Sequence, residues 1–226
     1  MTNILLTGAS RGIGAACAVA FKDQAVIGTG SADGDLADPA TPRRLWDSAL
    51  ERLGGRIDVL VNNAGVFEAA PIDLDHDEWV TQWERTMRIN LTASAELCRL
   101  AVRHFREHGG GRIVNVASRA AYRGDSPAHW HYAASKAGMI GMTKSIARGF
   151  AAENILAFAV CPGFTMTGMA EDYLSSRGGD KLLADIPLGR VAMPEEVASA
   201  VRYLALEAPP SMTGSVVDIN GASYVR

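Results

Sequence analysis

The stretch "NILLTGASRGIG", residues 3–14, joins a short apolar run to a turn that contains three glycines. The run at 3–7 is apolar without alternation, which is typical of a strand buried on both faces of a parallel sheet. A helical pattern begins at residue 12, so the glycines lie between a strand and a helix. Such a turn lets the backbone approach a phosphate group held at the helix N-terminus. The alternative is that the glycines serve only the turn and its packing.

Strand-like and helix-like segments alternate along the rest of the 226 residues. Further buried strands are expected at residues 25–29, 57–63, 112–118, 155–160 and 215–220. Helices are expected near residues 12–22, 41–53, 75–107, 130–152 and 194–206. This alternation predicts an α/β fold with a Rossmann-type, doubly wound parallel sheet. No repeat or linker divides the chain, so we expect a single domain over residues 1–226.

Composition argues against several function classes. The net charge is -3 and no block of five basic residues occurs, so no nucleic-acid partner is expected. Cys17, Cys98 and Cys161 are far apart and odd in number, which argues against a disulfide framework or a zinc site and favours buried thiols. The apolar run "ILAFAVC" is too short to span a bilayer, and the N-terminus lacks the basic region of a signal peptide. We therefore expect a cytoplasmic protein without a membrane partner.

The stretch "HYAASKAG", residues 131–138, places Tyr132 and Lys136 one helical turn apart. Residues at this spacing project from the same face of a helix. A neighbouring ammonium group favours the phenolate form of a tyrosine, so we expect Lys136 to lower the pKa of Tyr132 toward neutrality. A tyrosine activated in this way is suited to general acid and base catalysis. A solvated surface pair is the alternative.

Taken together, the TGxxxGxG turn, "NNAG" at 62–65, Ser118, "YAASK" at 132–136 and "PG" at 162–163 resemble the short-chain dehydrogenase/reductase family. The resemblance covers nearly the whole chain. The C-terminal stretch "PLGRVAMPEEVASAVRYLA…TGSVVDINGA" resembles the branch that contains beta-ketoacyl-carrier-protein reductases. The resemblance implies hydride transfer between a nicotinamide cofactor and a small-molecule ketone or secondary alcohol.

The same resemblance implies roles for individual residues. Tyr132 would exchange a proton with the substrate oxygen, Ser118 would orient the carbonyl, and Lys136 would also bind the nicotinamide ribose. Asn90 would anchor a water in a proton relay. The alternatives are a strand-end serine bonded to local backbone and a solvated helix asparagine. With Tyr132 and Lys136, the implied cofactor contacts are Gly8, Ser10, Arg11, Gly12, Ile13, Gly14, Thr29, Ser31, Asp35, Leu36, Asn62, Ala64, Gly65, Pro162, Gly163, Thr165 and Thr167. Asn63 is expected to be structural.

The chain departs from the family pattern in two places. Only a few residues separate Thr29 from "GDLAD" at 34–38, whereas a helical crossover to a parallel strand takes at least about 10 to 12. We therefore predict six strands in the order 2-1-4-5-6-7 of the family's numbering, with the third strand lost or vestigial. The 14 residues from Ser118 to Tyr132 are about one more than is usual for the family, which the intervening loop must absorb.

The residues near the end of the second strand indicate which nicotinamide cofactor is used. An NAD site usually has an acidic residue there, and "GTGS" at 28–31 has none. Arg11, supported by Thr29 and Ser31, is placed to bind a 2'-phosphate. We therefore expect NADP in preference to NAD. The alternative is that Asp33 swings in and favours NAD.

Other polar residues surround the expected substrate pocket. His129 and His131 share a face of an extended segment, but no third ligand is near, so we expect no metal. They are expected to shape the pocket instead. Arg119 and Arg123 would face an anionic substrate group or would be solvated loop residues. Residues 164–188 are expected to form a lid.

Apolar residues on the helices at 75–107 and 130–152 exceed what one buried face needs, and family members pair these helices across two-fold axes. The residues concerned are Leu97, Leu100, Met139, Ile140 and Met142. We expect a homodimer or homotetramer, with the tetramer favoured.

Two other functions remain alternatives to a general ketone reductase. The first is a catalytically idle cofactor-binding sensor or scaffold on the same fold, which the presence of four proton-handling residues disfavours. The second is a tailoring reductase of a biosynthetic pathway, acting on a cyclic or polyketide-like carbonyl.

Overall fold

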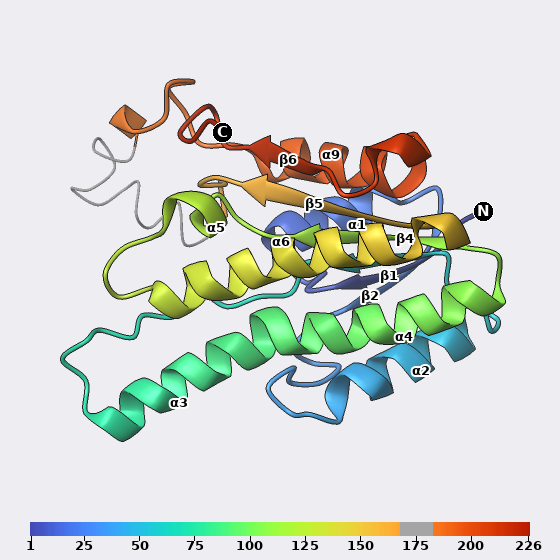
Figure 1. Ribbon diagram of the computed structural model, residues 1–226, viewed down its shortest axis with the longest axis horizontal. Coiled ribbons are helices and arrows are strands. Elements are labelled where there is room, and N and C mark those ends of the chain that lie inside the picture. Colours follow the sequence, from blue (N-terminus) through green and yellow to red (C-terminus); the bar gives the residue numbers. More distant parts are fainter. Residues whose placement is uncertain (168–182) are drawn as a thin grey trace.

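The strands of the protein form one parallel sheet in the computed structural model, which describes residues 1–167 and 183–226 (Figure 1). The strands are β1 (Asn3–Thr7), β2 (Ala25–Thr29), β3 (Val59–Asn62), β4 (Gly111–Val116), β5 (Ile155–Pro162) and β6 (Val216–Ile219). Their order is β2-β1-β3-β4-β5-β6, and every neighbouring pair is parallel. The predicted fold and strand order are confirmed.

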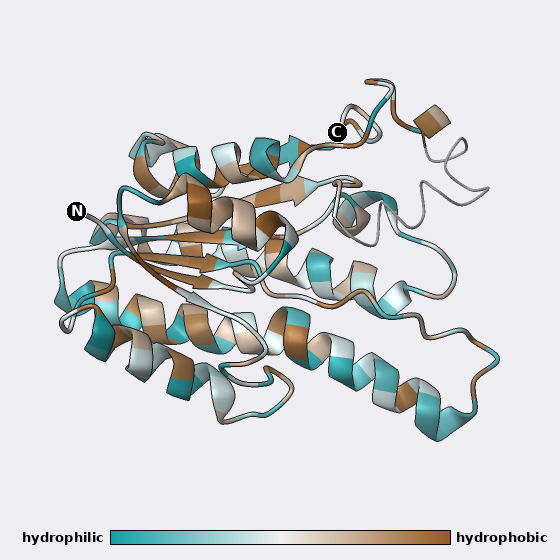
Figure 2. Cartoon of the chain, turned by 180° about the vertical axis from the view of Figure 1, so that it is seen from behind, coloured by the Kyte–Doolittle hydropathy of each residue, from teal (hydrophilic) through white to brown (hydrophobic). Residues whose placement is uncertain are grey.

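Helices cover both faces of the sheet, as Figures 1 and 2 show. They are α1 (Gly12–Ala20), α2 (Thr41–Arg52), α3 (His76–Met87), α4 (Ala93–Glu107), α5 (Ala120–Arg123), α6 (Trp130–Phe150) and α9 (Pro194–Leu206). Short turns of other helix types lie at Arg88–Thr92, Ala151–Glu153 and Pro210–Met212. Helices α1 and α9 pack on one face through one apolar cluster, and α2, α4 and α6 pack on the other face through a second cluster.

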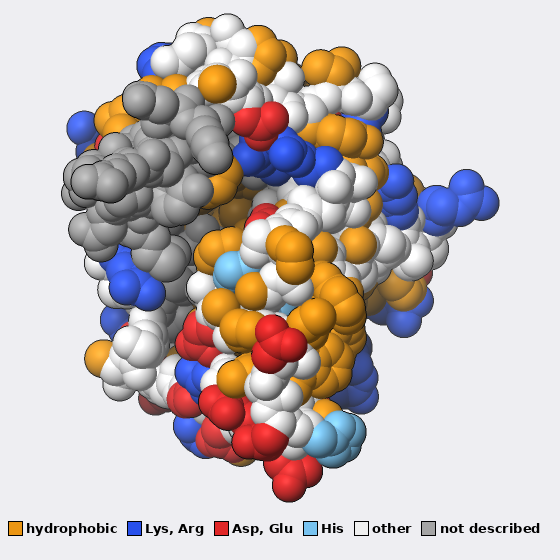
Figure 3. All heavy atoms as spheres, turned by 90° about the vertical axis from the view of Figure 1, so that its left-hand side faces the viewer, with side chains coloured by type: hydrophobic (Ala, Val, Ile, Leu, Met, Phe, Trp, Pro, Cys, Tyr) orange, Lys and Arg blue, Asp and Glu red, His pale blue; other side chains and the backbone are white. Residues whose placement is uncertain are grey.

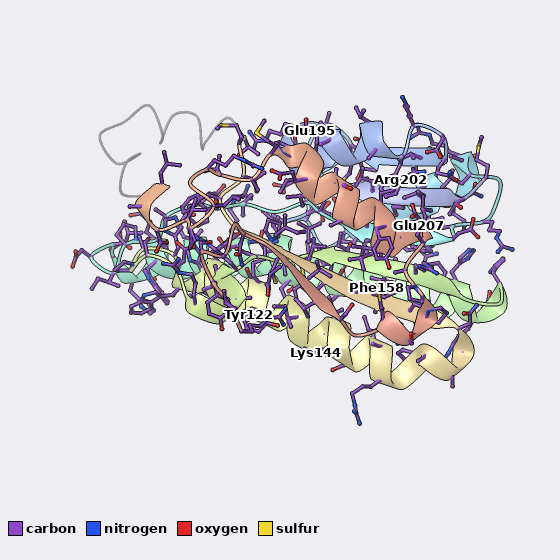
Figure 4. All side chains as sticks on the ribbon, turned by 90° about the horizontal axis from the view of Figure 1, so that it is seen from above. Tyr122, Lys144, Phe158, Glu195, Arg202 and Glu207 are labelled. Carbon is purple, nitrogen blue, oxygen red and sulfur yellow. The ribbon has the colours of Figure 1, made fainter. Side chains whose placement is uncertain are left out.

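Successive residues of each strand serve the two clusters in turn. On β1, Ile4 and Leu6 join the cluster under α1 and α9, whereas Leu5 joins the opposite one. This follows from the two-residue period of a strand. Phe158 on β5 belongs to the first cluster, and Figure 4 shows it in the body of the molecule, whereas Lys144 extends away from α6. A sheet buried on both faces therefore explains why the strands are apolar without alternation.

The family's third strand is missing from this chain, as the gap length predicts. β2 ends at Thr29 and α2 begins at Thr41, and the residues between them form turns without a strand. Asp35 holds this loop in place, because its carboxylate accepts the N–H of Ala37 at 2.9 Å and lies 3.4 Å from Nη1 of Arg85 on α3. β2 is consequently an edge strand.

The expected helix at 75–107 is divided into two parts. α3 begins after Asp75, whose carboxylate accepts the backbone N–H of Glu78 at 3.0 Å. A π-helical turn at Arg88–Thr92 separates α3 from α4 and contains Asn90. π-turns inside helices are frequent at functional sites.

The residues from which an oligomer interface was predicted are mostly core residues. Leu97, Met139 and Ile140 are buried within the chain, and Leu100 and Met142 pack against the cluster under α2, α4 and α6. Leu97, Met139 and Ile140 are therefore not available as a pairing surface, whereas Leu100 and Met142 are partly exposed, and the prediction of an oligomer stays open.

The cysteines are buried thiols, as expected. Cys17, Cys98 and Cys161 are free, and burial raises the pKa of each to about 12. Within residues 1–167 and 183–226, no helix combines the length and apolar character that crossing a bilayer requires.

Candidate active site

The candidate site lies at the carboxyl edge of the sheet, beside the point where the strand order reverses. The chain runs from β1 to β2 in one direction and then crosses back to β3 on the other side of β1. Ligands of open α/β sheets bind in the crevice at such a point. The face at which β5 and β6 end in Figure 1 is turned toward the viewer in Figure 3, which shows a hollow there.

The glycine turn after β1 is shaped to receive an anion. Gly8 and Gly12 have φ of +68° and +54°, a conformation that side chains rarely adopt, and a Cβ on Gly14 would overlap the carbonyl oxygen of Gly8. Arg11 precedes α1 in extended conformation, and its side chain does not cap the helix. The first turn of α1 has no acidic residue. No side chain of the described residues caps these N–H groups, so they can bind a pyrophosphate, and the residues present fit a dinucleotide.

Asn63 has the structural role predicted for it. Its Nδ2 donates to the carbonyl oxygens of Thr7 at 3.1 Å and Gly8 at 3.0 Å. The hydroxyl of Thr7 accepts the N–H of Ala64 at 3.1 Å. A Cβ on Gly8 would lie 2.8 Å from Cα of Ala64. The turn after β1 and the segment after β3, which continues to Gly65, are thus packed and bonded together.

Asn62, by contrast, turns its side chain into the core. Its Nδ2 donates to Oδ1 of Asn115 at 2.8 Å and to Sγ of Cys98 at 3.2 Å. Asn115 in turn donates to the hydroxyl of Thr143 at 2.8 Å. The prediction that Asn62 contacts a cofactor is therefore wrong for its side chain. The reason is the strand period, which points this last residue of β3 toward α4 and α6.

Tyr132 and Lys136 both lie on α6, and their neighbours come from the last residue of β4 and the segment that follows it. Tyr132 shares a side-chain hydrogen bond with Ser118, whose Oγ also accepts the N–H of Ala120 at 3.1 Å. Nζ of Lys136 lies 5.8 Å from the centroid of the Tyr132 ring and donates to the carbonyl oxygen of Val116 at 2.8 Å. Ser118 thus has both the local bond of a strand-end serine and a bond to the tyrosine.

Asn90 completes this group from the π-turn. It is buried, so the alternative of a solvated asparagine is wrong. Its Oδ1 accepts the N–H of Val66 at 2.8 Å, and its Nδ2 donates to the carbonyl oxygen of Val66 at 3.0 Å and to Oγ of Ser135 at 3.3 Å. A Cβ on Gly65 would lie 3.2 Å from Oδ1 of Asn90 and 3.4 Å from Nζ of Lys136. Gly65 therefore marks the place where these two side chains meet.

The electrostatics differ from the expectation for an activated tyrosine. Burial raises the pKa of Tyr132, and the hydrogen bond from Ser118 acts in the opposite direction. Burial lowers the pKa of Lys136 to about 8. The predicted lowering of the Tyr132 pKa by Lys136 is not found, because the ammonium group is bonded to Val116 and not to the phenol.

Asp33 lies at the end of β2, which is the placement that the alternative to the NADP expectation supposed. Asp33 folds back, and its Oδ2 accepts the N–H of Gly30 at 2.8 Å. Thr29 is buried, whereas Arg11 and Ser31 are exposed. The carboxylate thus reaches the strand end through a turn, which a position-by-position comparison does not detect.

Other predicted contacts of the adenosine end lie around the same loop. A Cβ on Gly30 would lie 3.3 Å from Oγ of Ser10. Leu36 is half-buried in the loop that Asp35 holds against α3, and Ile13 packs against the core cluster under α1.

The segment after β5 returns to the glycine turn. The N–H of Gly163, which follows Pro162, donates to the carbonyl oxygen of Ile219 at 2.9 Å. The hydroxyl of Thr165 donates to the carbonyl oxygen of Gly163 at 3.2 Å. A Cβ on Gly12 would lie 2.9 Å from Cγ2 of Thr167, so this threonine stands beside the start of α1. Most of the predicted lid, 168–182, lies outside the described residues.

An aromatic wall beside Tyr132 was not predicted. The ring of Phe67 lies edge-on to Tyr132, with centroids 4.8 Å apart, and is stacked on His129 at 3.9 Å. His131 belongs to α6 and not to an extended segment, and its ring faces that of Trp83 at 6.2 Å. Among the residues that the structure describes, no group of three or more His, Cys, Asp and Glu could hold a metal ion. An aromatic residue two positions after "NNAG" was the available clue to Phe67.

Comparisons with known proteins agree with this geometry. Residues 25–222 match the family model described as Enoyl-(Acyl carrier protein) reductase. The chain is 34% identical over 241 residues to the 3-oxoacyl-acyl-carrier-protein reductase FabG of Vibrio cholerae, covering 98% of this chain and 96% of that protein. It is 35% identical over 246 residues to FabG of Thermotoga maritima, covering 98% and 97%. It is also 34% identical over 238 residues to the acetoacetyl-CoA reductase of Rhizobium meliloti, covering 97% of each. The chain belongs to the short-chain dehydrogenase/reductase family and is an NAD(P)-dependent oxidoreductase.

Proposed function

We propose that the protein interconverts a small-molecule ketone and a secondary alcohol, with Tyr132 as the acid and base and with NADP(H) as the preferred cofactor. The observation that carries the proposal is the meeting of Ser118, Tyr132, Lys136 and Asn90 at the carboxyl edge of the sheet. Relatives named as 3-oxoacyl-acyl-carrier-protein and acetoacetyl-CoA reductases support a carbonyl substrate.

In the direction of reduction, Tyr132 transfers its phenolic proton to the carbonyl oxygen of the substrate. A bound nicotinamide supplies the hydride for this reduction or accepts it in the reverse reaction. Burial, which raises the pKa of Tyr132, keeps the phenol protonated at neutral pH, and this is the state that a proton donor needs. The hydroxyl of Ser118 donates to Tyr132 in this structure, and with a ketone bound it would turn its one proton to the same substrate oxygen and fix it.

Lys136 returns a proton to Tyr132 and regains one from solvent, and Asn90 would anchor a water in this relay while holding the backbone of Val66. Nζ of Lys136 and Oδ1 of Asn90 both border Gly65, so a polar path leads away from the tyrosine. With a pKa of about 8, Lys136 remains mostly charged at neutral pH and can still give up a proton at small cost.

The glycine turn and the segment Asn63–Gly65 would hold the dinucleotide, with the pyrophosphate on the free N–H groups of α1. Arg11 is the cation beside this turn, and we assign it to the 2'-phosphate of NADP. Asp33 supports the opposite choice, because a carboxylate at the end of β2 accepts hydrogen bonds from the ribose of NAD. One oxygen of Asp33 already accepts the N–H of Gly30, whereas the exposed side chain of Arg11 donates to no residue in 1–167 or 183–226.

A panel of ketones and secondary alcohols, assayed with both cofactors by nicotinamide absorbance, tests the proposal. We expect turnover of at least one ketone, with NADPH giving the higher kcat/KM. Tight binding of NADPH without turnover of any carbonyl or alcohol in the panel would contradict it and favour an idle cofactor-binding protein.

A further inference from the structure

Arg119 is a buried cation directly after Ser118, and its charge is not used by the proposed mechanism. The residue is 8% exposed. Cζ of its guanidinium lies 4.8 Å from the centroid of the Phe164 ring, so the side chain is stacked between the ends of β4 and β5. Its Nη1 is buried and makes no hydrogen bond to any residue that the structure describes. A buried, unsatisfied donor of a charged group costs free energy, so its retention requires an explanation.

The carboxylate nearest to Arg119 is bonded to another residue. Oδ2 of Asp185 lies 3.6 Å from Nη1 of Arg119, which is beyond hydrogen-bond distance, but only 2.6 Å from Nη1 of Arg123. Arg123 also donates to the carbonyl oxygen of Ser223 at 3.2 Å. The charges of Asp185 and Asp125 attract Arg119, and that of Arg123 repels it. Asp185 thus sits where a better-fitting carboxylate would pair with Arg119.

We infer that Arg119 binds a carboxylate group of the substrate, which displaces Asp185, and that the preferred substrate is a small keto acid. Arg119 adjoins Ser118, which faces the reacting carbonyl, so the bound anion lies within a few bonds of that carbonyl. A guanidinium matches a carboxylate through two parallel hydrogen bonds. The phosphate of a coenzyme A or carrier-protein thioester lies many bonds from its ketone and does not fit this position. Figure 3 shows basic side chains with an acidic one at the border of the hollow.

The inference rests on the proposed function, because it assumes that the protein reduces ketones. Matched pairs of charged and uncharged ketones test the carboxylate site separately from the reduction itself. Acetoacetate and levulinate are compared with their methyl esters, which keep the ketone and lose the charge. We expect wild type to give a kcat/KM at least about tenfold higher for the acids, and Arg119→Gln to remove this preference while changing the esters less than about threefold. Asp185→Asn, which removes the competing carboxylate, should instead raise kcat/KM for the acids. Arg106→Gln is the charge control, since Arg106 pairs with Glu153 far from the site.

A binding measurement decides the inference if no ketone is reduced. Butyrate and butyramide are titrated calorimetrically into the wild-type protein and the Arg119→Gln variant, each with NADPH present and absent. Butyrate binding that butyramide does not reproduce, and that Arg119→Gln loses, supports the carboxylate site whatever the activity. If Arg119→Gln does not fold, Arg119→Lys replaces it, and a weakened preference for the acids is expected because lysine lacks the planar fork. Equal use of acids and esters by wild type, or unchanged butyrate binding in the variant, overturns the inference.

Discussion

Nζ of Lys136 is hydrogen-bonded at 2.8 Å to the carbonyl oxygen of Val116, the last residue of β4. This bond ties the N-terminal part of α6 to the strand that precedes Ser118. Burial of this charged group, and not the hydrogen bond, lowers the pKa of Lys136 to about 8. The lysine is therefore a positioned and destabilised cation, and both properties have measurable consequences.

Lys136→Met should change how stability depends on pH. Lysine has an ordinary pKa of 10.5, so between about pH 8 and 10.5 the unfolded chain binds more protons at this residue than the folded one. The free energy of unfolding therefore rises with pH in that window. Below about pH 8 the buried charge of Lys136 destabilises the folded state by the full amount, about 3 kcal/mol. The advantage of Lys136→Met over wild type in urea unfolding should be largest at pH 7 and shrink toward pH 10. Lys144→Met, on the exposed side of α6, should show a constant difference.

Tyr132→Phe should lower kcat at least about a hundredfold, because the ring remains but the proton donor is lost. Cofactor affinity, measured by fluorescence titration, should be largely retained. Tyr203→Phe is the control, since this tyrosine is 41% exposed on α9. Near-normal turnover by Tyr132→Phe would refute the assigned acid.

The two reaction directions should respond to pH in opposite ways. A pKa of Tyr132 above its ordinary value keeps the phenol protonated across the neutral range, so kcat/KM for ketone reduction should be flat from pH 6 to 8. Alcohol oxidation needs the phenolate, and its kcat/KM should rise with pH over the same interval. Ser118→Ala removes the bond that lowers this pKa and should shift the oxidation profile to higher pH. A flat oxidation profile in wild type contradicts this assignment.

Arg11→Ala and Asp33→Asn should separate the two nicotinamide cofactors. Loss of a charged hydrogen bond to the 2'-phosphate should weaken NADPH binding by about 1.5 to 3 kcal/mol and leave NADH little changed. Asp33→Asn keeps an oxygen for the N–H of Gly30 and removes the charge, so it should weaken NADH and not NADPH. Calorimetric titration with both cofactors distinguishes these effects. A wild-type preference for NADH, or equal weakening of both cofactors by Arg11→Ala, would show that the 2'-phosphate assignment is wrong.

Light scattering at micromolar concentration should report a homotetramer. The outward face of α6 carries small exposed residues at Ala134, Ala137 and Gly141, which permit a second helix to approach closely. A side chain on Gly141 would meet nothing within 4 Å in this chain, and the same holds for Gly149 near the end of α6. Gly141→Gln should therefore reduce the oligomer size without loss of fold, whereas Gly149→Gln should not. A stable wild-type monomer would contradict the prediction.

Loop length and residue spacing along the sequence predicted the strand order and the position of Tyr132 beside Lys136. The features that the sequence did not predict depend on contacts between residues far apart in the chain. The gap between Thr29 and "GDLAD" excluded a third strand because a crossover needs a minimum length of chain. Helical spacing placed Tyr132 near Lys136, but the partner of the lysine lies 20 residues away on β4 and depends on tertiary packing. Asp33 reaches the end of β2 through a turn hydrogen bond, and strand pleating turns Asn62 inward. The sequence left the first as an alternative and gave no sign of the second.

The π-turn at Arg88–Thr92 joins α3 to α4 without a loop and changes the direction in which the side chains of α4 point relative to those of α3. An α-helix advances about 100° per residue, so one extra residue in a turn rotates everything beyond it by about that angle. The side chains of α3 and α4 consequently obey separate periodicities although no loop interrupts them. Trp83 of α3 contacts His131, whereas Leu97 of α4 packs in the apolar cluster against the sheet. Each helix therefore directs its own side chains toward a different neighbour. One inserted residue thus allows α3 to contact the helix that carries Tyr132 while α4 packs on the core, although the two helices are continuous.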